Sequence, residues 1–373
     1  MKMIERIEQQ DEALIVAWKA GGESRFPYLW LRDNCRCSRC RDPRNGQRLF
    51  DALDLPAEPR PTLVVLDASV IAIRWQEGHE SRYAAAWLAA HDLSPAARAR
   101  RRPDLRLWGA EIANDLPRAD WPAVLADPAI ELHLLEGLAR YGFALLQQVP
   151  VEEGQVAAVG DRLGHVRVTN YGRLFDVVSL PNPNNLAFTA VGLSVHTDNP
   201  YRDPTPGLQL LHCLECGAPG GDTVLVDGFR AAEELRQRHP EDFAILARLP
   251  LSFHFADADA DLKASTPVIS TDFEGRVTAV HFNNRSMTAL DLPEAEILPW
   301  YRAYRRFAAI LREPASELRL RLAPGDLIIM ENNRALHGRT AFDPNLGRRH
   351  LQGCYVDKDG VESRRRVLQR SVA

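Results

Sequence analysis

The sequence predicts a mainly β protein with flanking helices, divided into a small N-terminal domain and a larger C-terminal domain. Three observations predict this fold class. The 373 residues are enough for about two domains. Residues 1–95 contain short runs of β-forming residues that turn residues separate. Further along, strand-like runs and helical stretches follow one another without a regular βαβ rhythm, which favours a β-barrel or a β-sandwich.

The N-terminal part contains strands at residues 13–18, 62–66 and 70–75, where β-branched, aliphatic and aromatic residues gather. Residues 96–125 combine several prolines with a basic run, which is typical of a solvated linker. A phosphate-binding patch is the alternative interpretation of that run. We therefore expect a small β-rich domain at 1–95, a linker at 96–125 and a second domain at 126–373. The basic run consists of Arg98, Arg100, Arg101 and Arg102.

The C-terminal part begins with a helix at 129–141, where apolar residues recur at helical spacing. A buried strand is expected at 142–146. Further strands are expected at 207–213, 222–226 and 326–330, and a helical stretch at 231–249 interrupts them.

Composition and charge limit the kinds of partner. The chain is 45% hydrophobic and 26% charged, and its net charge of −4 comes from 46 basic and 50 acidic residues. This balance gives no general attraction to nucleic acid, so small ligands are expected. We find no apolar run near the roughly 18 residues that cross a bilayer, and the first residues lack a secretory pattern. We expect a cytoplasmic protein with neither a membrane nor a nucleic-acid partner.

A His-x-Asp triplet at His196 and Asp198, together with the distant His337, predicts a metal site. Residues two apart on a strand point to the same face, so two imidazoles and one carboxylate could bind one ion. Such a facial triad leaves three positions open, as Fe(II) needs to hold a bidentate co-substrate and admit O₂. A zinc hydrolase and an inactive binding protein are the alternatives. Other histidines that could compete as ligands are His165, His212 and His350.

Three cysteines near the N-terminus predict a second metal site. Cys35, Cys37 and Cys40 fall within six residues, a spacing that suits tetrahedral Zn²⁺ with one further ligand. His79 is the natural fourth ligand, because His91 lies near the end of the domain. Four protein ligands would make this zinc structural. Reactive or buried thiols are the alternative, and core positions are expected for the remaining cysteines, Cys213, Cys216 and Cys354.

Five ordered blocks carry a resemblance to a known family. They are His196-Thr-Asp-Asn-Pro, Gly207-Leu-Gln-Leu-Leu-His-Cys213, Gly220-Gly-Asp-Thr-Val-Leu-Val-Asp-Gly228, Leu336-His-Gly-Arg339 and Arg349-His-Leu-Gln-Gly-Cys-Tyr355. Across nearly its whole length the chain resembles Fe(II)/2-oxoglutarate oxygenases of the taurine dioxygenase-like superfamily, and among these the γ-butyrobetaine dioxygenase branch. The resemblance implies a double-stranded β-helix, or jelly roll, with Fe(II) on His196, Asp198 and His337. It also implies 2-oxoglutarate and O₂ as co-substrates, a Cys₃His zinc site in the N-terminal domain and a homodimer.

The resemblance assigns Arg349 to the distal carboxylate of 2-oxoglutarate. A guanidinium offers a planar fork of donors that matches a carboxylate. Thr223 is expected to donate a second hydrogen bond to the same group. Arg339 and Arg348 are neighbours of the anchor, and we expect them to pair with other groups on the surface.

The resemblance also implies a trimethylammonium substrate. A quaternary ammonium has no N–H to donate, so aromatic faces hold it best, through cation–π attraction. The positions that match the family's aromatic cage are Tyr171, Phe175, Phe188 and Tyr355.

The anionic end of that substrate is expected to meet Asn185 and the pair Asn283-Asn284. The chain departs from the animal enzymes here, and Arg285 follows the asparagine pair where they have alanine. A phosphonate offers three oxygens and up to two negative charges, which suits an extra guanidinium. The pattern resembles that of bacterial enzymes that hydroxylate 2-(trimethylammonio)ethylphosphonate at C1. We favour this substrate over γ-butyrobetaine, which would give L-carnitine, and over trimethyllysine. The expected phosphonate donors are Asn199, Tyr201, Asn284 and Arg285.

Overall fold

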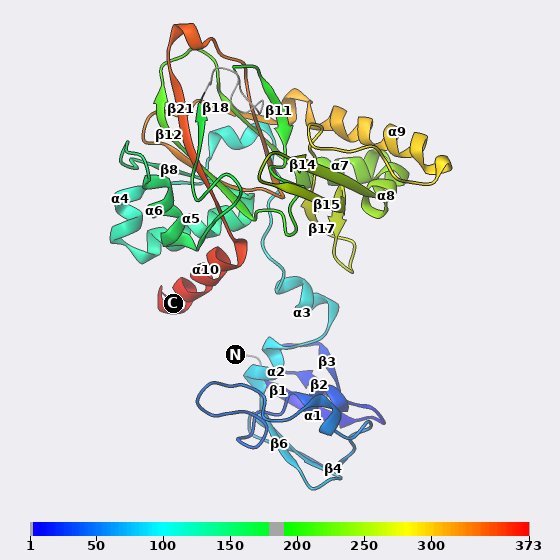
Figure 1. Cartoon of the computed structure of the whole chain (residues 1–373). Coiled ribbons are helices and arrows are strands. Elements are labelled where there is room, and N and C mark those ends of the chain that lie inside the picture. Colours follow the sequence, from blue (N-terminus) through cyan, green and yellow to red (C-terminus); the bar gives the residue numbers. More distant parts are fainter. Residues whose placement is uncertain (1–2, 179–189, 373) are drawn as a thin grey trace. The chain divides into compact units, whose positions relative to one another are not determined.

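The computed structural model describes residues 3–178 and 190–372 and divides the chain into two compact units (Figure 1). Unit 1 spans Met1–Pro103 and unit 2 spans Asp104–Ala373.

Unit 1 is built from two antiparallel three-stranded sheets and short helices. The first sheet contains β1 (Ile4–Gln9), β2 (Ala13–Trp18) and β3 (Glu23–Pro27), and the second contains β4 (Pro61–Asp67), β5 (Val70–Trp75) and β6 (Glu80–Ala84). The helices are α1 (Tyr28–Asp33), α2 (Ala85–Ala90) and α3 (Pro95–Arg100), with a 3₁₀ turn at Ala52–Asp54. The strands expected at 13–18, 62–66 and 70–75 are confirmed.

The core of unit 1 follows from strand periodicity. In β5, alternate residues Ile71, Ile73 and Trp75 are buried, as one face of a strand requires. The buried indole of Trp75 donates to Ser81 Oγ at 2.9 Å, so its only polar atom is satisfied. This bond crosses from β5 to β6 and fixes the turn between them, which carries His79.

Unit 2 contains two main sheets that are almost entirely antiparallel. The larger has seven strands, with β10-β21-β12-β19-β8-β7 in order and β9 on β21; the smaller has four, in the order β11-β20-β13-β18. The larger sheet comprises β7 (Arg118–Asp120), β8 (Phe143–Gln147), β9 (Val166–Arg167), β10 (Phe175–Val178), β12 (Leu208–Cys216), β19 (Leu327–Glu331) and β21 (Arg349–Val356). The smaller comprises β11 (Leu193–His196), β13 (Thr223–Asp227), β18 (Glu317–Leu320) and β20 (Ala335–Arg339). Two hairpins complete the set: β14 (Pro250–Ala256) with β15 (Asp261–Pro267), and β16 (Ile269–Thr271) with β17 (Val277–Val280).

Two groups of helices flank the sheets of unit 2, on opposite sides in Figure 1. One group, α4 (Trp121–Ala126), α5 (Pro128–Tyr141), α6 (Gln155–Leu163) and α10 (Lys358–Val372), packs against the larger sheet. The other group is α7 (Gly228–Arg238), α8 (Pro240–Arg248) and α9 (Glu294–Leu311). Short 3₁₀ turns lie at Ala110–Asn114, Pro314–Ser316 and Pro344–Leu346. This architecture confirms the predicted fold class of a jelly-roll core with flanking helices and a small β-rich N-terminal unit.

The helical stretch expected at 231–249 is two helices, because α7 ends before His239 and α8 begins at Pro240. Proline lacks a backbone N–H and fits the first turn of a helix, so it starts α8 where it would interrupt α7.

The linker expected at 96–125 differs from the structure, which places residues 104–125 in unit 2. Trp108 is 2% exposed and its indole donates to the carbonyl of Tyr141 at 2.6 Å. Strand β7 pairs with β8, and Pro122 stands in the first turn of α4. The prolines therefore mark element starts, and a buried tryptophan ties the segment to unit 2.

One basic side chain near the C-terminus pairs with a buried carboxylate. Arg364 donates two hydrogen bonds of 2.7 Å to Glu131, whose side chain is buried in α5. Burial of a carboxylate needs such pairing, so this contact fixes α10 on α5.

Candidate functional site

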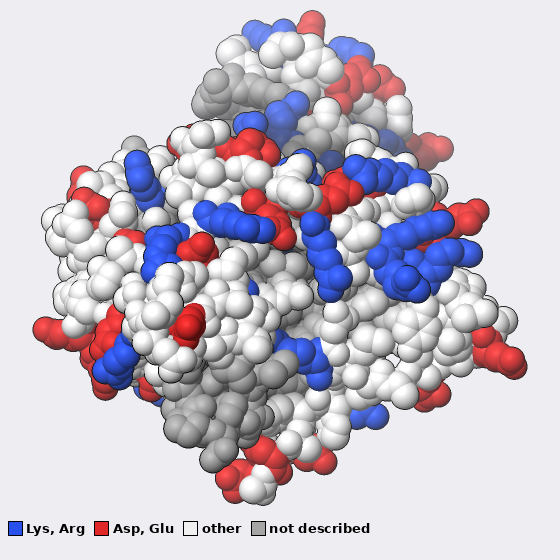
Figure 2. All heavy atoms as spheres, turned by 90° about the horizontal axis from the view of Figure 1, so that it is seen from above, with Lys and Arg blue, Asp and Glu red and all other residues white. Residues whose placement is uncertain are grey.

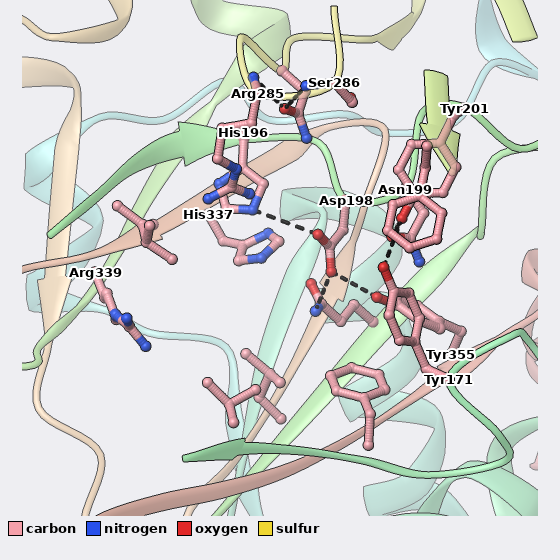
Figure 3. Close-up of a pocket in the computed structure, with 18 of the residues that line it drawn as sticks. Tyr171, His196, Asp198, Asn199, Tyr201, Arg285, Ser286, His337, Arg339 and Tyr355 are labelled. Carbon is pink, nitrogen blue, oxygen red and sulfur yellow. Dashed lines mark hydrogen bonds and ion pairs between the residues drawn. The ribbon is translucent and has the colours of Figure 1, made fainter. Parts of the chain in front are cut away.

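A cavity of about 470 Å³ lies between the two main sheets of unit 2 and contains the predicted triad. His196 ends β11, Asp198 follows it, and His337 lies on β20 directly opposite His196 in the register. One ligand atom from each residue lies within 4.8 Å of those of the other two. Figure 3 shows the imidazoles of His196 and His337 and the Asp198 carboxylate pointing toward one another. Strand pairing thus brings together ligands that are far apart in the sequence.

A hydrogen bond orients the His196 ring, and the surroundings of His337 and Asp198 shift the pKa of each. His196 Nδ1 lies 2.9 Å from the carbonyl oxygen of Ser194, which accepts from it and leaves Nε2 for a metal. Burial, assisted by His196, lowers the pKa of His337 to about 3. Burial opposes ionisation of Asp198, but the neighbouring His196 and His337 outweigh it and lower the pKa of that carboxyl. Neutral imidazole and ionised carboxylate are the forms that bind metal.

The predicted co-substrate residues line the same cavity as the triad. Arg349 begins β21 and Thr223 begins β13; both are buried, and both line the cavity. Arg349 Nε donates to the carbonyl oxygen of Gly221 at 3.0 Å. Gly221 has φ of +71°, and a Cβ there would lie 2.8 Å from Arg349 Nε. Glycine is thus needed at this turn for two reasons, its backbone conformation and the close approach of Arg349.

The two neighbouring arginines behave differently from each other. Arg348 pairs on the surface with Glu215 at 3.3 Å, as expected. Arg339 was expected on the surface too, and this is wrong, because it is 6% exposed and lines the cavity. It lies on β20 two residues after His337, so strand alternation turns both side chains to the same face.

Three of the four predicted cage residues line the cavity: Tyr171, Phe175 and Tyr355. The rings of Phe175 and Tyr355 are stacked with centroids 5.0 Å apart. Asn185 and Phe188 lie outside the described residues.

The hairpin β14–β15 contributes cavity residues that the motifs did not indicate. His254, Phe255 and Ala256 line the cavity, and the ring of Phe255 stacks on Tyr201 with centroids 5.1 Å apart. The alternating run at residues 251–255 could have predicted the strand. Nothing in it indicates that residue 255 lines the cavity.

At the expected anionic end, Asn199, Tyr201 and Arg285 line the cavity. Tyr201 Oη donates to Asn199 Oδ1 at 2.6 Å, and Tyr171 Oη lies 3.0 Å from Tyr201 Oη. Asn199 Nδ2 is buried and has no hydrogen-bond partner among the described residues. Its backbone has φ of +49°, a conformation that asparagine tolerates better than most residues.

The expectation for Asn284 is wrong in this structure. Its side chain is absent from the cavity lining, and its Oδ1 accepts from Tyr304 Oη at 2.7 Å. Asn283, the other member of the expected pair, lines the cavity. The Asn283 amide donates to the carbonyl of Thr197 and accepts from the backbone N–H of Arg285, which fixes the turn with its neighbour facing outward.

The predicted zinc ligands meet in unit 1. His79 Nε2 lies 3.3, 3.6 and 3.6 Å from the Sγ atoms of Cys35, Cys37 and Cys40, respectively. In tetrahedral zinc with ordinary bond lengths, sulfur and nitrogen would be roughly 3.6 Å apart. The donor set and spacing therefore fit structural Zn²⁺. His91, the excluded candidate, stacks on Trp87 with ring centroids 4.3 Å apart.

The remaining histidines and cysteines discussed above lie outside the two metal-ligand clusters. His350 pairs with Asp176 at 2.8 Å, and His212 is fully buried on β12. Cys213 and Cys354 are buried, while Cys216 is partly exposed.

On the face drawn in Figure 2, lysine and arginine side chains lie among aspartate and glutamate side chains. Among the described residues, no helix is both long and apolar enough to cross a bilayer.

Comparisons with known proteins agree with this geometry. Residues 94–355 match the family model described as taurine catabolism dioxygenase TauD, TfdA family, and residues 5–89 match that of gamma-butyrobetaine hydroxylase-like N-terminal domains. The gamma-butyrobetaine dioxygenase of Pseudomonas sp. (strain AK-1) is 38% identical over 359 residues, covering 95% of this chain and 93% of that protein. The trimethyllysine dioxygenase of Meyerozyma guilliermondii is 32% identical over 377 residues, covering 96% and 94%.

Among solved structures, asparagine oxygenase in complex with Fe(II), 2S,3S-3-hydroxyasparagine and succinate aligns with a TM-score of 0.50 and 21% identity. The alignment covers 70% of this chain and 87% of that chain. At this identity it supports the fold alone.

Proposed function

The chain belongs to the taurine catabolism dioxygenase TauD, TfdA family and is an Fe(II)- and 2-oxoglutarate-dependent dioxygenase; on this premise we propose that it hydroxylates a small trimethylammonium phosphonate. The favoured substrate is 2-(trimethylammonio)ethylphosphonate, hydroxylated at C1. The second candidate is γ-butyrobetaine, giving L-carnitine, which the 38% identity to a gamma-butyrobetaine dioxygenase favours.

In this proposal His196, Asp198 and His337 hold Fe(II). The donor set fits, because two neutral imidazoles and one carboxylate are the ligands of the non-haem iron triad. When bound, iron with 2-oxoglutarate and O₂ supplies the oxidising power for C–H hydroxylation, and the co-substrate becomes succinate and CO₂.

Arg349 and Thr223 bind the distal carboxylate of 2-oxoglutarate. Both are buried and line the cavity. The bond from Arg349 Nε to Gly221 fixes the orientation of the guanidinium, so its terminal N–H groups are oriented before the co-substrate arrives.

The cationic end of the substrate lies against the aromatic wall formed by Tyr171, Phe175 and Tyr355. Trimethylammonium groups are attracted to ring faces through cation–π interaction. They have no N–H to donate, so a hydrogen-bond acceptor attracts them only through its charge. The Tyr355 hydroxyl donates to Asp198, so the ring face is the part of Tyr355 that can meet the substrate.

The charge of the cavity lining is the observation that carries the phosphonate preference. Among the described residues that line the cavity, and without counting Arg339, Arg285 and Arg349 supply two guanidiniums and Asp198 supplies one carboxylate. The two charges of Fe(II) and the two of 2-oxoglutarate cancel, so a positive excess remains for the substrate. A doubly ionised phosphonate with one ammonium has a net charge of −1, whereas γ-butyrobetaine is neutral overall. Asn199 supports the same choice through its unpartnered amide N–H groups.

Replacing Arg285 with methionine tests this preference. We expect kcat/KM for the phosphonate to fall by about 10- to 150-fold, the range for losing a hydrogen bond to a charged group. The loss with γ-butyrobetaine should be much smaller, because a carboxylate has one charge and fewer acceptor oxygens. Succinate formation coupled to each substrate measures both values.

Arg276→Met is the matched control, since Arg276 pairs with Asp272 at 2.6 Å and is absent from the cavity lining. It should leave both substrates unaffected. An equal loss on both substrates in Arg285→Met would defeat the phosphonate preference.

The proposal also includes a structural zinc domain in unit 1, a cytoplasmic location and a homodimer. The first is supported by the closed Cys₃His set, whose four ligands leave no position for a substrate. The homodimer stays a prediction, and sedimentation of the purified protein would test it.

A further inference from the structure

The two carboxylate oxygens of Asp198 lie in different surroundings. Oδ1 lies 3.5 Å from His196 Nε2, on the side of the two histidines. Oδ2 accepts hydrogen bonds from Tyr355 Oη at 2.6 Å and from Gln209 Nε2 at 2.8 Å. The dashed lines at Asp198 in Figure 3 mark these contacts. One oxygen is thus directed to the metal position, and the other is occupied by protein donors.

The chemistry of the donors fixes the direction of both bonds. An ionised carboxylate only accepts, so the phenol must donate its O–H and the amide must turn its NH₂ to Asp198. Gln209 and Tyr355 are each 3% exposed, so both donors are held in fixed, buried positions. Hydrogen bonds to an ionised acceptor in such surroundings are stronger than neutral ones.

The two donors form a cross-strand pair. Gln209 on β12 lies directly opposite Tyr355 on β21 in the larger sheet. The histidines lie on β11 and β20 of the smaller sheet, so Asp198 links the two sheets. Asn332 fixes the backbone of Asp198 from a third direction, by accepting from its N–H at 2.8 Å and donating to its carbonyl at 2.9 Å. The carboxylate is therefore restrained at both ends.

We propose that Gln209 and Tyr355 are positioning residues that keep Asp198 a ligand through one oxygen. If Oδ2 also reached the iron, it would occupy one of the three positions that a facial triad leaves open. Tyr355 has a second contact, its stacked ring on Phe175. The same residue therefore connects the aromatic wall to the iron ligand. This inference rests on the proposed role of the triad as the Fe(II) site.

Two variants remove one donor each. Gln209→Met keeps the length of the side chain and removes the N–H groups, and Tyr355→Phe keeps the ring that stacks on Phe175. We expect the Fe(II) dissociation constant, measured without oxygen or substrate, to rise about 10- to 100-fold in each, as for other partners of metal ligands. The absorption band of the anaerobic Fe(II)–2-oxoglutarate complex should also shift.

Matched controls separate positioning from general packing. Gln147→Met removes a glutamine on β8 that lies 3.5 Å from Asp326, and Tyr304→Phe removes a hydroxyl that donates to Asn284. Neither residue lines the cavity, so both controls should keep the wild-type Fe(II) affinity and band position. Thermal unfolding of each metal-free variant shows whether it is folded.

The outcomes distinguish failure of the proposed Fe(II) site from failure of the positioning role alone. Wild-type protein that binds no Fe(II) at this triad would overturn the proposed function itself. Wild-type binding with unchanged affinity and an unshifted band in Gln209→Met and Tyr355→Phe would overturn the positioning role alone. If Gln209→Met fails to fold, Tyr355→Phe still tests the positioning role, because the Tyr355→Phe change deletes a single hydroxyl.

Discussion

Arg349→Met is expected to raise the dissociation constant of 2-oxoglutarate strongly. Arg349 is 6% exposed, and its Nε is already bound to Gly221, so the rest of the guanidinium is oriented for one bound carboxylate. Removing one partner of a buried charged pair costs about 2–5 kcal/mol, or about 30- to 4,000-fold in the dissociation constant. Anaerobic titration of the Fe(II) protein with 2-oxoglutarate, followed by its charge-transfer absorption, measures this change.

Arg348→Met is the control for this variant, because Arg348 is the adjacent residue and pairs with Glu215 on the surface. It should bind 2-oxoglutarate as the wild type does. Equal affinities in Arg349→Met and Arg348→Met would show that the co-substrate is held elsewhere.

Cys40→Ser is expected to release zinc and unfold unit 1. Cys40 is 3% exposed and is one of four ligands that close the coordination sphere. The binding free energy of structural zinc, about 10–16 kcal/mol in small domains, acts as folding free energy there. Zinc content should fall to near zero, and the amides of β4, β5 and β6 should lose protection from hydrogen exchange.

Cys216→Ser is the control, since Cys216 is partly exposed in unit 2 and belongs to no metal-ligand group among the described residues. It should keep its zinc and its exchange protection. Full zinc content in purified Cys40→Ser would contradict the assignment of this ligand set.

Local patterns predicted the metal clusters because those patterns determine geometry directly. The short spacing of His196 and Asp198 keeps both at one site, although β11 ends at His196 and Asp198 lies just beyond the strand. The three cysteines are close enough to converge in one loop. Local spacing alone does not identify the distant ligands His337 and His79. Family resemblance identified His337, and the small number of candidates in the domain identified His79.

The cavity wall was harder to predict, because it depends on turns and on contacts between distant elements. Asn283 and Asn284 are chemically identical, and only the hydrogen bonds of the turn decide that the first faces inward. Phe255 enters the cavity from a hairpin whose sequence shows only a strand. Arg339 follows the same alternation as His337, so its inward orientation could have been predicted from the strand itself.

We propose that this chain couples 2-oxoglutarate turnover to hydroxylation of a trimethylammonium phosphonate. The decisive experiment is turnover under ¹⁸O₂ with 2-(trimethylammonio)ethylphosphonate, followed by mass spectrometry of both products. We expect one ¹⁸O atom in succinate and one in a new hydroxyl at C1 of the phosphonate. Succinate formation at the substrate-free rate, with no ¹⁸O in the phosphonate, would contradict the proposal.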